Sequence, residues 1–461
     1  MPYFRRLKTM FLIHAVRYNN MQENATGLRR EVGLFQLVAY GIGNIIGAGI
    51  YVLIGAASGL AGNQVWLAFL VGAVIALFTG LSYAELAAMY PKAASEYIYL
   101  GRAYGSRILS FLTEWIMLIT EIVAASTVSL GFAMYFQSVY QMPLLVVAAV
   151  LLVGLTVLAI LGIKQSLMVN TVLSIIAIIG LLIVIGAGIP KIGSTNYMVS
   201  PNGWQGIFSA AILVFFAYIG FDNIANLSEE TKDPYRTIPK GLLIAIFITT
   251  ILYVLVGITA VSLVPWQELS ASNAPLALAA SAALGPIAFG ILTLAALFTT
   301  LNTVLVLLIV GSRIIYGMAR EGALPEFLGR IGKTSGAPYM ASIATLVVAL
   351  LFLSLGGIGI VARITSFGSL LTFALVNLAL IHLRKVAPNL KRPFKAPLSI
   401  GWLSVSGLIG LVSCFALLTQ FDAQSALLGM ILPVSGIVVY VFYKKDKILA
   451  VDATLHEPHE R

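Results

Sequence analysis

Charged residues are scarce in this sequence, and their scarcity excludes an ordinary soluble domain. Only 10% of the 461 residues are charged, against roughly 25% in soluble globular domains. Hydrophobic residues make up 59% of the chain. They form uninterrupted runs of about 20 residues, which favours membrane-spanning helices over the alternating pattern of a β-barrel. The composition therefore predicts an all-α polytopic protein embedded in a lipid bilayer.

Cysteine and histidine are also rare. The single cysteine, Cys414, excludes an internal disulfide framework, and the predicted outer loops contain none, so we expect no disulfide-linked accessory subunit. The four histidines are scattered. No metal cluster, nucleophile triad or P-loop is visible in the sequence, so we expect no metal, no cofactor and no enzymatic activity. The net charge of +10 does not indicate a nucleic-acid partner, because the basic residues flank apolar runs.

Twelve apolar runs are predicted to be transmembrane helices. Prolines stand at several of their ends, as expected of residues that interrupt helices. The predicted spans are residues 33–60, 65–90, 106–137, 143–162, 166–189, 204–227, 238–263, 286–319, 339–355, 361–384, 399–421 and 425–443. They leave an N-terminal tail of residues 1–32 and a C-terminal tail of residues 444–461.

The basic residues predict the orientation of these spans. With the N-terminus inside, all but two of the 28 lysines and arginines fall in inner segments, the exceptions being Lys191 and Arg363. Because inner loops carry the excess of positive charge, both tails are predicted to be cytosolic in a cell-membrane protein. Short amphipathic helices are expected in the inner segments 91–105 and 320–338, and the outer segment 266–284 has room for a small helix.

A glycine-rich stretch, G-I-G-N-I-I-G-A-G-I-Y, occupies residues 41–51 in the middle of the first span. Glycine costs about 1 kcal/mol per position inside a helix, so the stretch predicts either close helix packing or a helix break. A break within a membrane is tolerated where the backbone meets a cavity, an ion or a substrate. The sixth span carries a similar signal, because Gly220 stands beside the intramembrane Asp222.

Five spans separate the two glycine-containing breaks. Residues 33–189 and 204–385 then form two halves of opposite orientation, each beginning with a broken helix, and residues 399–443 add two further helices. This pattern is typical of inverted-repeat secondary transporters, whose substrate site lies at the midplane where both broken helices meet.

The breaks also suggest a ligand. Free amide groups at Ile46 to Gly49 begin a half-helix and favour a carboxylate. Free carbonyl groups near Phe216 to Ile219 end another half-helix and favour an ammonium group. Together they predict a site for an α-amino acid. The candidate substrate-binding residues are Ile45, Ile46, Gly47, Ala48, Gly49, Phe215, Phe216, Ala217, Tyr218 and Ile219.

Three motifs carry a resemblance to a known family. They are the stretch 41–51, F-F-A-Y-I-G-F-D-N-I-A-N-L-S-E-E-T-K-D-P-Y-R-T-I-P from Phe215, and F-T-T-L-N-T-V-L-V-L-L-I-V-G-S-R-I-I-Y-G-M-A-R-E-G-A-L-P from Phe298. With them the chain resembles the amino acid–polyamine–organocation (APC) family, and within it the prokaryotic branch similar to cationic amino acid transporters. The resemblance implies the leucine-transporter-type fold of five plus five helices, alternating access and import of L-amino acids.

Lys164, in G-I-K-Q-S at the start of the fifth span, has two interpretations. Its position alone is explained by a basic residue that extends to the inner headgroups. The resemblance implies instead that its ammonium group replaces a sodium ion between spans 1 and 8, near Gly43 and Thr299 or Thr300. A buried lysine can release and regain a proton. This second interpretation predicts proton-coupled, sodium-independent transport.

Other acidic residues keep alternatives open. Glu121 in span 3 contacts the substrate, relays a proton or forms an interhelical hydrogen bond. Asp222 contacts the substrate or caps the second half of helix 6. Glu85, near the inner end of span 2, is interpreted as a packing or gate contact. Two functional alternatives also stand beside proton-coupled import: exchange of amino acids or polyamines, and a transporter-like amino acid sensor.

Overall fold

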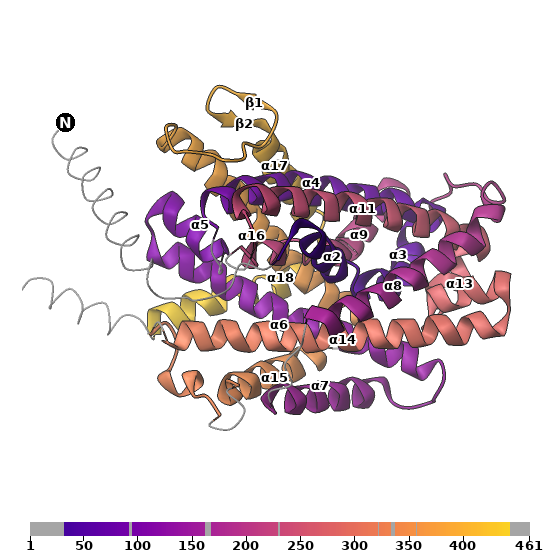
Figure 1. Ribbon diagram of the computed structural model, residues 1–461. Helices are drawn as coiled ribbons and strands as arrows, with labels where there is room; N and C mark the ends of the chain where they lie inside the picture. Colours follow the sequence, from indigo (N-terminus) through magenta and orange to yellow (C-terminus); the bar gives the residue numbers. More distant parts are fainter. Residues whose placement is uncertain are drawn as a thin grey trace, which may run out of the picture.

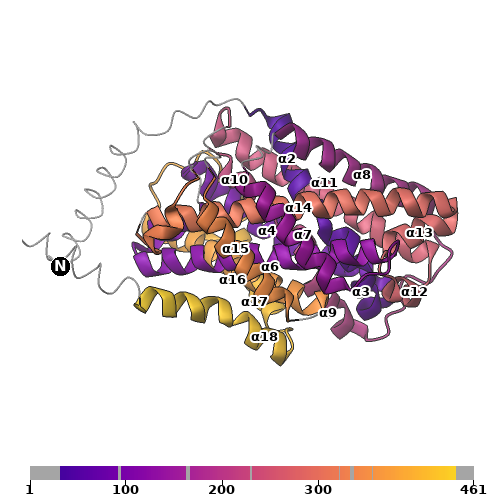
Figure 2. The ribbon, with the colours of Figure 1, turned by 90° about the horizontal axis from the view of Figure 1, so that it is seen from below.

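The computed structural model describes residues 32–91, 95–161, 167–228, 231–320, 322–332, 337–355 and 357–442. This part of the chain is built almost wholly from helices, and its only named strands are two residues long each. Figure 1 shows the long helices side by side, most of them running along one common direction. Figure 2 gives the same bundle from below.

The first part of the chain alternates long helices with short connections, and a single 3₁₀ turn links α3 to α4. Its helices are α2 (Leu34–Ile45), α3 (Ala48–Ala61), α4 (Val65–Met89), α5 (Ser95–Tyr104), α6 (Arg107–Gln137), α7 (Leu144–Ile160) and α8 (Leu167–Gly188).

The second part of the chain also begins with an interrupted helix, and two further helices follow at its end. Its helices are α9 (Gly203–Phe215), the 3₁₀ turn η3 (Phe216–Tyr218), α10 (Asn223–Asn226), α11 (Pro234–Leu263), α12 (Trp266–Ala271), α13 (Pro275–Leu284), α14 (Pro286–Arg320), η4 (Glu326–Gly329), α15 (Tyr339–Leu353), α16 (Ile358–Val386), α17 (Val405–Leu418) and α18 (Ala423–Gly429). After a turn at Met430, helix continues to Phe442.

Eight segments of the described chain are long and apolar enough to cross a membrane. The first of them, Leu34–Met89, combines α2, α3 and α4. The apolar helices α7, α15 and α17 are shorter, with 17, 15 and 14 residues. A helix therefore lies in each of the twelve predicted ranges. Of the expected short helices, α5 lies in segment 91–105, and α12 and α13 lie in segment 266–284, whereas the described part of segment 320–338 contains the 3₁₀ turn η4.

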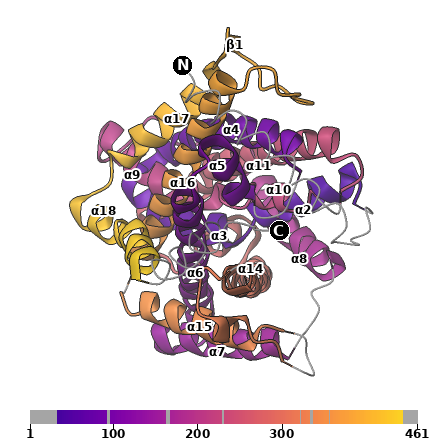
Figure 3. The ribbon, with the colours of Figure 1, turned by 90° about the vertical axis from the view of Figure 1, so that its left-hand side faces the viewer.

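The bundle has a buried centre and an apolar outer surface. Helix α6 is the most enclosed of the eight long apolar segments, and Figure 3 shows α3, α14, α15 and α16 arranged around it. Large apolar side chains on the outer helices are exposed, for example Val150, Phe247 and Leu294. Because a water-soluble protein rarely exposes so much continuous apolar surface, these faces are suited to lipid.

One predicted helix starts later than expected. Residues 399–404, placed in a span by the sequence, form instead a small hairpin in which β1 (Ser399–Ile400) pairs antiparallel with β2 (Leu403–Ser404). Gly401 at the turn has φ +60°, a conformation that glycine adopts without strain. Helix α17 begins only at Val405, where the Ser404 hydroxyl accepts a hydrogen bond from the Gly407 N–H.

Candidate functional site

The first span is interrupted within the glycine-rich stretch. Helix α2 ends at Ile45, and Ile46 and Gly47 are not helical, with ψ values of 63° and −150°. Helix α3 then begins at Ala48, with no side chain capping its first amides. The amides of the first turn of α3 therefore lack helical partners and point toward the break, where they favour negative charge.

The sixth span is interrupted as well. Helix α9 tightens into the 3₁₀ turn η3, and residues 219–222 are not helical before the short α10 begins at Asn223. Gly220 has φ +113°, which an L side chain rarely adopts. The carbonyls at the end of η3 thus lose their regular partners, and they favour a hydrogen-bond donor or a cation.

The two interruptions touch one another. A Cβ atom added to Gly220 would lie 2.9 Å from the Asn44 carbonyl oxygen, and one added to Gly49 would lie 2.6 Å from the Ala217 Cα. Such contacts are possible only because both positions are glycine. The glycines therefore serve to bring the backbone of α2 and α3 against the backbone of the η3 region.

Tyr253 of α11 joins the two interruptions from a third side. Its hydroxyl lies 2.6 Å from the Ile45 carbonyl oxygen and 2.9 Å from the Ala217 carbonyl oxygen, and donates its proton between them. One hydroxyl thus satisfies carbonyls at the end of both half-helices. Tyr253 is not among the predicted site residues, because a tyrosine within an apolar helix gives no sign of its distant partners.

A cavity lies between the interrupted helices, with about 590 Å³ of empty space when its open side is included. Several candidate substrate-binding residues line it: Ile45, Gly47, Ala48, Gly49, Phe216, Ala217 and Ile219. Gly43 and Glu121 line it too. The cavity also has wall residues that the sequence analysis did not name as ligands: Asn44, Ala124, Gly220, Asn223, Asn302, Thr303, Val306 and Leu307.

Three candidate substrate-binding residues do not line this cavity. Ile46 is buried with 1% of its surface exposed. Phe215 packs against Phe373, with ring centroids 6.1 Å apart. The Tyr218 hydroxyl donates to the Phe69 carbonyl oxygen at 3.0 Å. The two aromatic residues expected as cavity walls thus serve to pack the helices together.

The residues expected around Lys164 are only partly described. Lys164 itself lies outside the described residues. Thr299 and Thr300 donate their hydroxyls to carbonyls of their own helix, at Ala295 and Ala296, and neither lines the cavity. The α8 side chain against Gly43 is Ser174, whose Oγ would lie 2.0 Å from a Cβ added to that glycine.

Two buried acids lie near the interruptions. Glu121 of α6 is 2% exposed and lines the cavity. Asp222 is fully buried and accepts a hydrogen bond from the Gly220 N–H at 3.0 Å. Asp222 occupies the cap position of α10. Its side chain accepts the N–H of Gly220 at the break, and not the first amides of α10 that a capping residue would bind. Its second oxygen has no hydrogen-bond partner among the described residues.

A third buried acid, Glu96 of α5, lies outside the spans and reaches the neighbourhood of Asp222 through Tyr83. It accepts hydrogen bonds from the Tyr83 hydroxyl at 2.8 Å and the Ser95 hydroxyl at 2.7 Å. The Tyr83 ring meets Phe221, the neighbour of Asp222, with centroids 5.7 Å apart. Burial raises the pKa of the Glu96 carboxyl above its ordinary value of 4.5.

This shift predicts a pH dependence of stability. A carboxyl with a higher pKa in the folded protein keeps its proton longer there, so stability falls as pH rises from the unfolded pKa through the folded one. We therefore expect Glu96→Gln to lose less thermal stability than the wild type as pH rises from about 4.5. Glu268→Gln, on the exposed α12, controls for the loss of one carboxylate. If the melting temperatures of the wild type and of Glu96→Gln change in parallel with pH, the prediction is contradicted.

Metal chemistry receives no support from the side chains. Among the described residues, no group of three or more His, Cys, Asp or Glu side chains is arranged to hold a metal ion. The cavity offers instead backbone amides, backbone carbonyls and amide or hydroxyl side chains, which suit a small zwitterion.

Comparison with known proteins agrees with a cavity that suits a small zwitterion such as an amino acid. The family model described as "Amino acid permease" matches residues 32–442. The chain belongs to this amino acid permease family of the APC superfamily. Its relatives are transporters rather than enzymes, which supports amino acid transport and a multi-pass membrane protein for this family member.

Relatives in the family differ in their named substrates. The chain is 32% identical to the branched-chain amino acid permease BcaP of Bacillus subtilis, over 91% of this chain and 94% of the relative. It is 28% identical to the methylthioribose transporter of Bacillus subtilis, over 93% and 96%. It is 29% identical to the vacuolar cationic amino acid transporter 4 of Arabidopsis thaliana, over 83% and 67%.

Proposed function

We propose that this permease imports L-amino acids across the cell membrane by alternating access. The observation that carries the proposal is the contact of the two interrupted helices around one cavity, with α3 beginning and η3 ending at its wall. The substrate carboxylate binds the free amides at the start of α3, near Ala48 and Gly49. The ammonium group binds carbonyls at the end of η3, near Ala217.

The proposed architecture has twelve spans. Spans 1–5 and 6–10 form two inverted repeats, spans 11 and 12 follow them, and both termini lie in the cytosol. Its support is that each repeat would begin with an interrupted helix: α2 and α3 in the first, and α9 to α10 in the second. Inverted repeats of this kind place the substrate between the two interruptions, where rocking of one part against the other exposes it to either side.

A neutral aliphatic amino acid is the proposed substrate class. Phe216, Val306 and Leu307 supply an apolar part of the cavity wall. The branched-chain permease among the relatives agrees with this class. Glu121 on the same wall favours a second class, cationic amino acids, since its carboxylate would pair with a basic side chain. A thermal-shift screen of the purified permease against the standard amino acids separates the two classes.

We further propose that Lys164 couples transport to protons in place of sodium. Uptake into proteoliposomes should then respond to an inward proton gradient and be indifferent to sodium, because the lysine ammonium occupies the cation position and exchanges its proton between states. Lys164→Ala should abolish uptake. Lys240→Ala, an exposed lysine at the start of α11, is the matched control and should transport normally.

Sodium-driven uptake together with an active Lys164→Ala variant would contradict proton coupling through this lysine. Exchange is tested in the same vesicles, since internal substrate accelerates uptake strongly in an exchanger and weakly in a symporter. Failure of the wild-type protein to move any amino acid that shifts its melting temperature would favour the sensor.

A further inference from the structure

The segment that begins at the end of α16, residues 385–404, extends sideways from the bundle. In Figure 1 the β1–β2 hairpin stands beyond the edge of the long helices, to the side of the bundle. Figure 3, which looks along the helices, shows the same hairpin outside the ring of helices. A loop that continues the helix direction would enter the aqueous phase. One that extends sideways would meet the lipid around the bundle.

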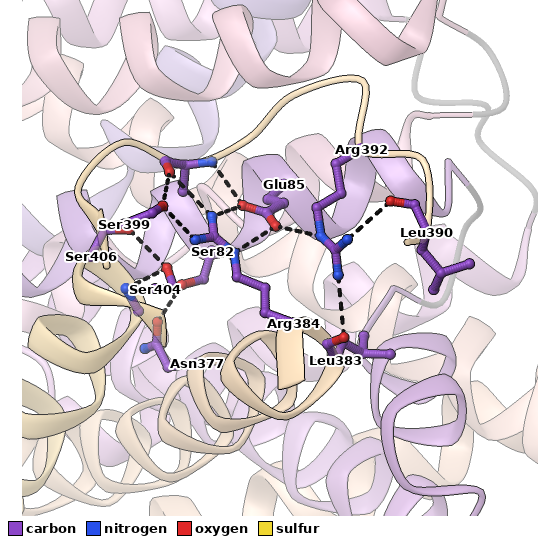
Figure 4. A network of polar contacts seen from close by, with 12 residues as sticks. Ser82, Glu85, Asn377, Leu383, Arg384, Leu390, Arg392, Ser399, Ser404 and Ser406 are labelled. Carbon is purple, nitrogen blue, oxygen red and sulfur yellow. Dashed lines mark hydrogen bonds and ion pairs between the residues drawn. The ribbon is translucent and has the colours of Figure 1, made fainter. Parts of the chain in front are cut away.

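Buried ion pairs hold the base of this segment (Figure 4). Arg384 of α16 donates from Nε to the Glu85 Oε1 at 2.9 Å and pairs with the other Glu85 oxygen through a second nitrogen. Arg392 pairs with Glu85 at 3.2 Å. The Ala396 N–H donates to the same carboxylate at 2.7 Å, and the Ser399 hydroxyl accepts from Arg384 at 2.7 Å. Glu85 is therefore a packing contact that ties the end of α16 to the middle of the segment, at Arg392 and Ala396.

The remaining basic residues of the segment point outward. Residues 385–404 contain no acidic residue. Arg392 donates to backbone carbonyls such as those of Leu383 and Leu390, whereas Lys385, Lys391 and Lys395 are exposed. The loop thus holds three lysines on a fixed frame, and their charge is unopposed within the segment.

Large apolar side chains are exposed beside these lysines. Leu398 is 58% exposed, Ile400 at the hairpin 73% and Trp402 48%. The Lys385 ammonium lies 5.5 Å from the centre of the Trp402 ring. Tryptophan and lysine together are typical of the membrane interface, where the ring lies at headgroup depth and the ammonium reaches phosphate.

We propose that residues 385–404, the interface segment, bind anionic phospholipid headgroups in the cytosolic leaflet. The apolar side chains of the hairpin enter the boundary of the acyl chains, and the three lysines contact headgroup phosphates. Each lysine near an anionic surface contributes about fivefold in affinity. The lipid then stabilises the end of α16 against the inner end of α4, through the frame that Glu85 holds.

The test measures lipid retention by native mass spectrometry of the full-length permease with equimolar phosphatidylglycerol and phosphatidylcholine. We expect the wild type to retain phosphatidylglycerol preferentially. The variant Lys385→Gln, Lys391→Gln, Lys395→Gln should lose that preference by tenfold or more, since three such contacts contribute on the order of 100-fold. The charge-matched control Arg236→Gln, Lys240→Gln, Arg330→Gln removes three exposed bases elsewhere and should stay within about twofold of the wild type.

Several results would overturn the proposal. An unchanged lipid preference in the three-lysine variant is one, and equal loss in the control is another. Displacement of the bound lipid by inorganic phosphate would indicate a free anion as the ligand. If the wild type is a dimer that dissociates in the three-lysine variant while lipid retention is unchanged, the segment binds a second copy of the chain and not lipid.

The depth of the hairpin gives an independent measurement. In nanodiscs containing brominated phosphatidylcholine, the difference in tryptophan emission between the wild type and Trp402→Phe should show quenching of Trp402. An unquenched Trp402 would place the hairpin in water and overturn the proposal. The lysine variants, their controls and Trp402→Phe change exposed side chains and leave the ion pairs of Glu85 intact, so they are expected to fold. Monodisperse elution of each purified variant verifies this.

Discussion

Glu85→Ala should destabilise the permease by about 3–5 kcal/mol, the usual loss when one partner of a buried ion pair is removed. Glu85 is fully buried, and the Arg384 side chain is 3% exposed. Removing the carboxylate leaves two guanidinium groups without their countercharge and the Ala396 N–H without its acceptor. The measurement is the loss of melting temperature of the purified protein in detergent, together with its urea midpoint where unfolding is reversible.

The exposed pair between Arg363 and Asp422 is the matched control. Their side chains are 20% and 47% exposed, and the charged atoms lie 2.5 Å apart. Because solvent screens such a pair, Arg363→Gln should cost no more than about 1 kcal/mol. Pairing Glu85→Leu with Arg384→Met should recover part of the loss, since an apolar replacement removes both charges. Equal losses for Glu85→Ala and Arg363→Gln would contradict the assigned role of the buried pair.

The positions of both interruptions were predictable because they have local causes. Glycines at 41–49 and the Gly220–Asp222 pair weaken a helix wherever it folds. The partners of Glu85 were not predictable, since Arg384 lies 299 residues away in the sequence. Tyr253 was missed for the same reason: its acceptors, Ile45 and Ala217, come from two other helices.

The rotation of a helix was harder to predict than its existence. The prediction on span 8 concerned Thr299 and Thr300 beside Lys164, whereas Asn302 and Thr303, the span 8 residues that line the substrate cavity, were not predicted. In span 6 the tightening into η3 turns successive residues by about 120° rather than 100°. Phe216 and Ala217 then line the cavity, while Phe215 and Tyr218 lie away from it.

The hairpin at residues 399–404 was mistaken for helix because composition alone does not separate the two. The run P-L-S-I-G-W-L contains no charged residue and leads directly into the apolar helix that follows it. Its backbone is fixed by contacts that the sequence does not display, such as that of Ser399 with Arg384. Short apolar runs remain ambiguous until their partners are known.

Gly49→Ala should strongly weaken substrate binding, because the added methyl group would meet backbone. Its Cβ would lie 2.6 Å from the Ala217 Cα and 3.1 Å from the Ala217 nitrogen. Backbone cannot rotate away as a side chain does, so α3 and η3 must move apart at the proposed carboxylate and ammonium sites. Overpacking of this kind costs about 1–3 kcal/mol. We expect substrate affinity to fall at least tenfold, measured as the substrate-induced thermal shift and as the KM of uptake.

Gly290→Ala on α14 is the matched control for Gly49→Ala. A Cβ added at Gly290 meets nothing within 4 Å, so alanine there should raise stability by up to about 1 kcal/mol through better helix propensity. Its transport should match the wild type. If Gly49→Ala also transports with wild-type affinity, contact between the two interruptions is not required for binding. If only its stability falls, that contact serves folding alone. Only a loss of affinity specific to Gly49→Ala supports the proposal that the interrupted helices bind the substrate together.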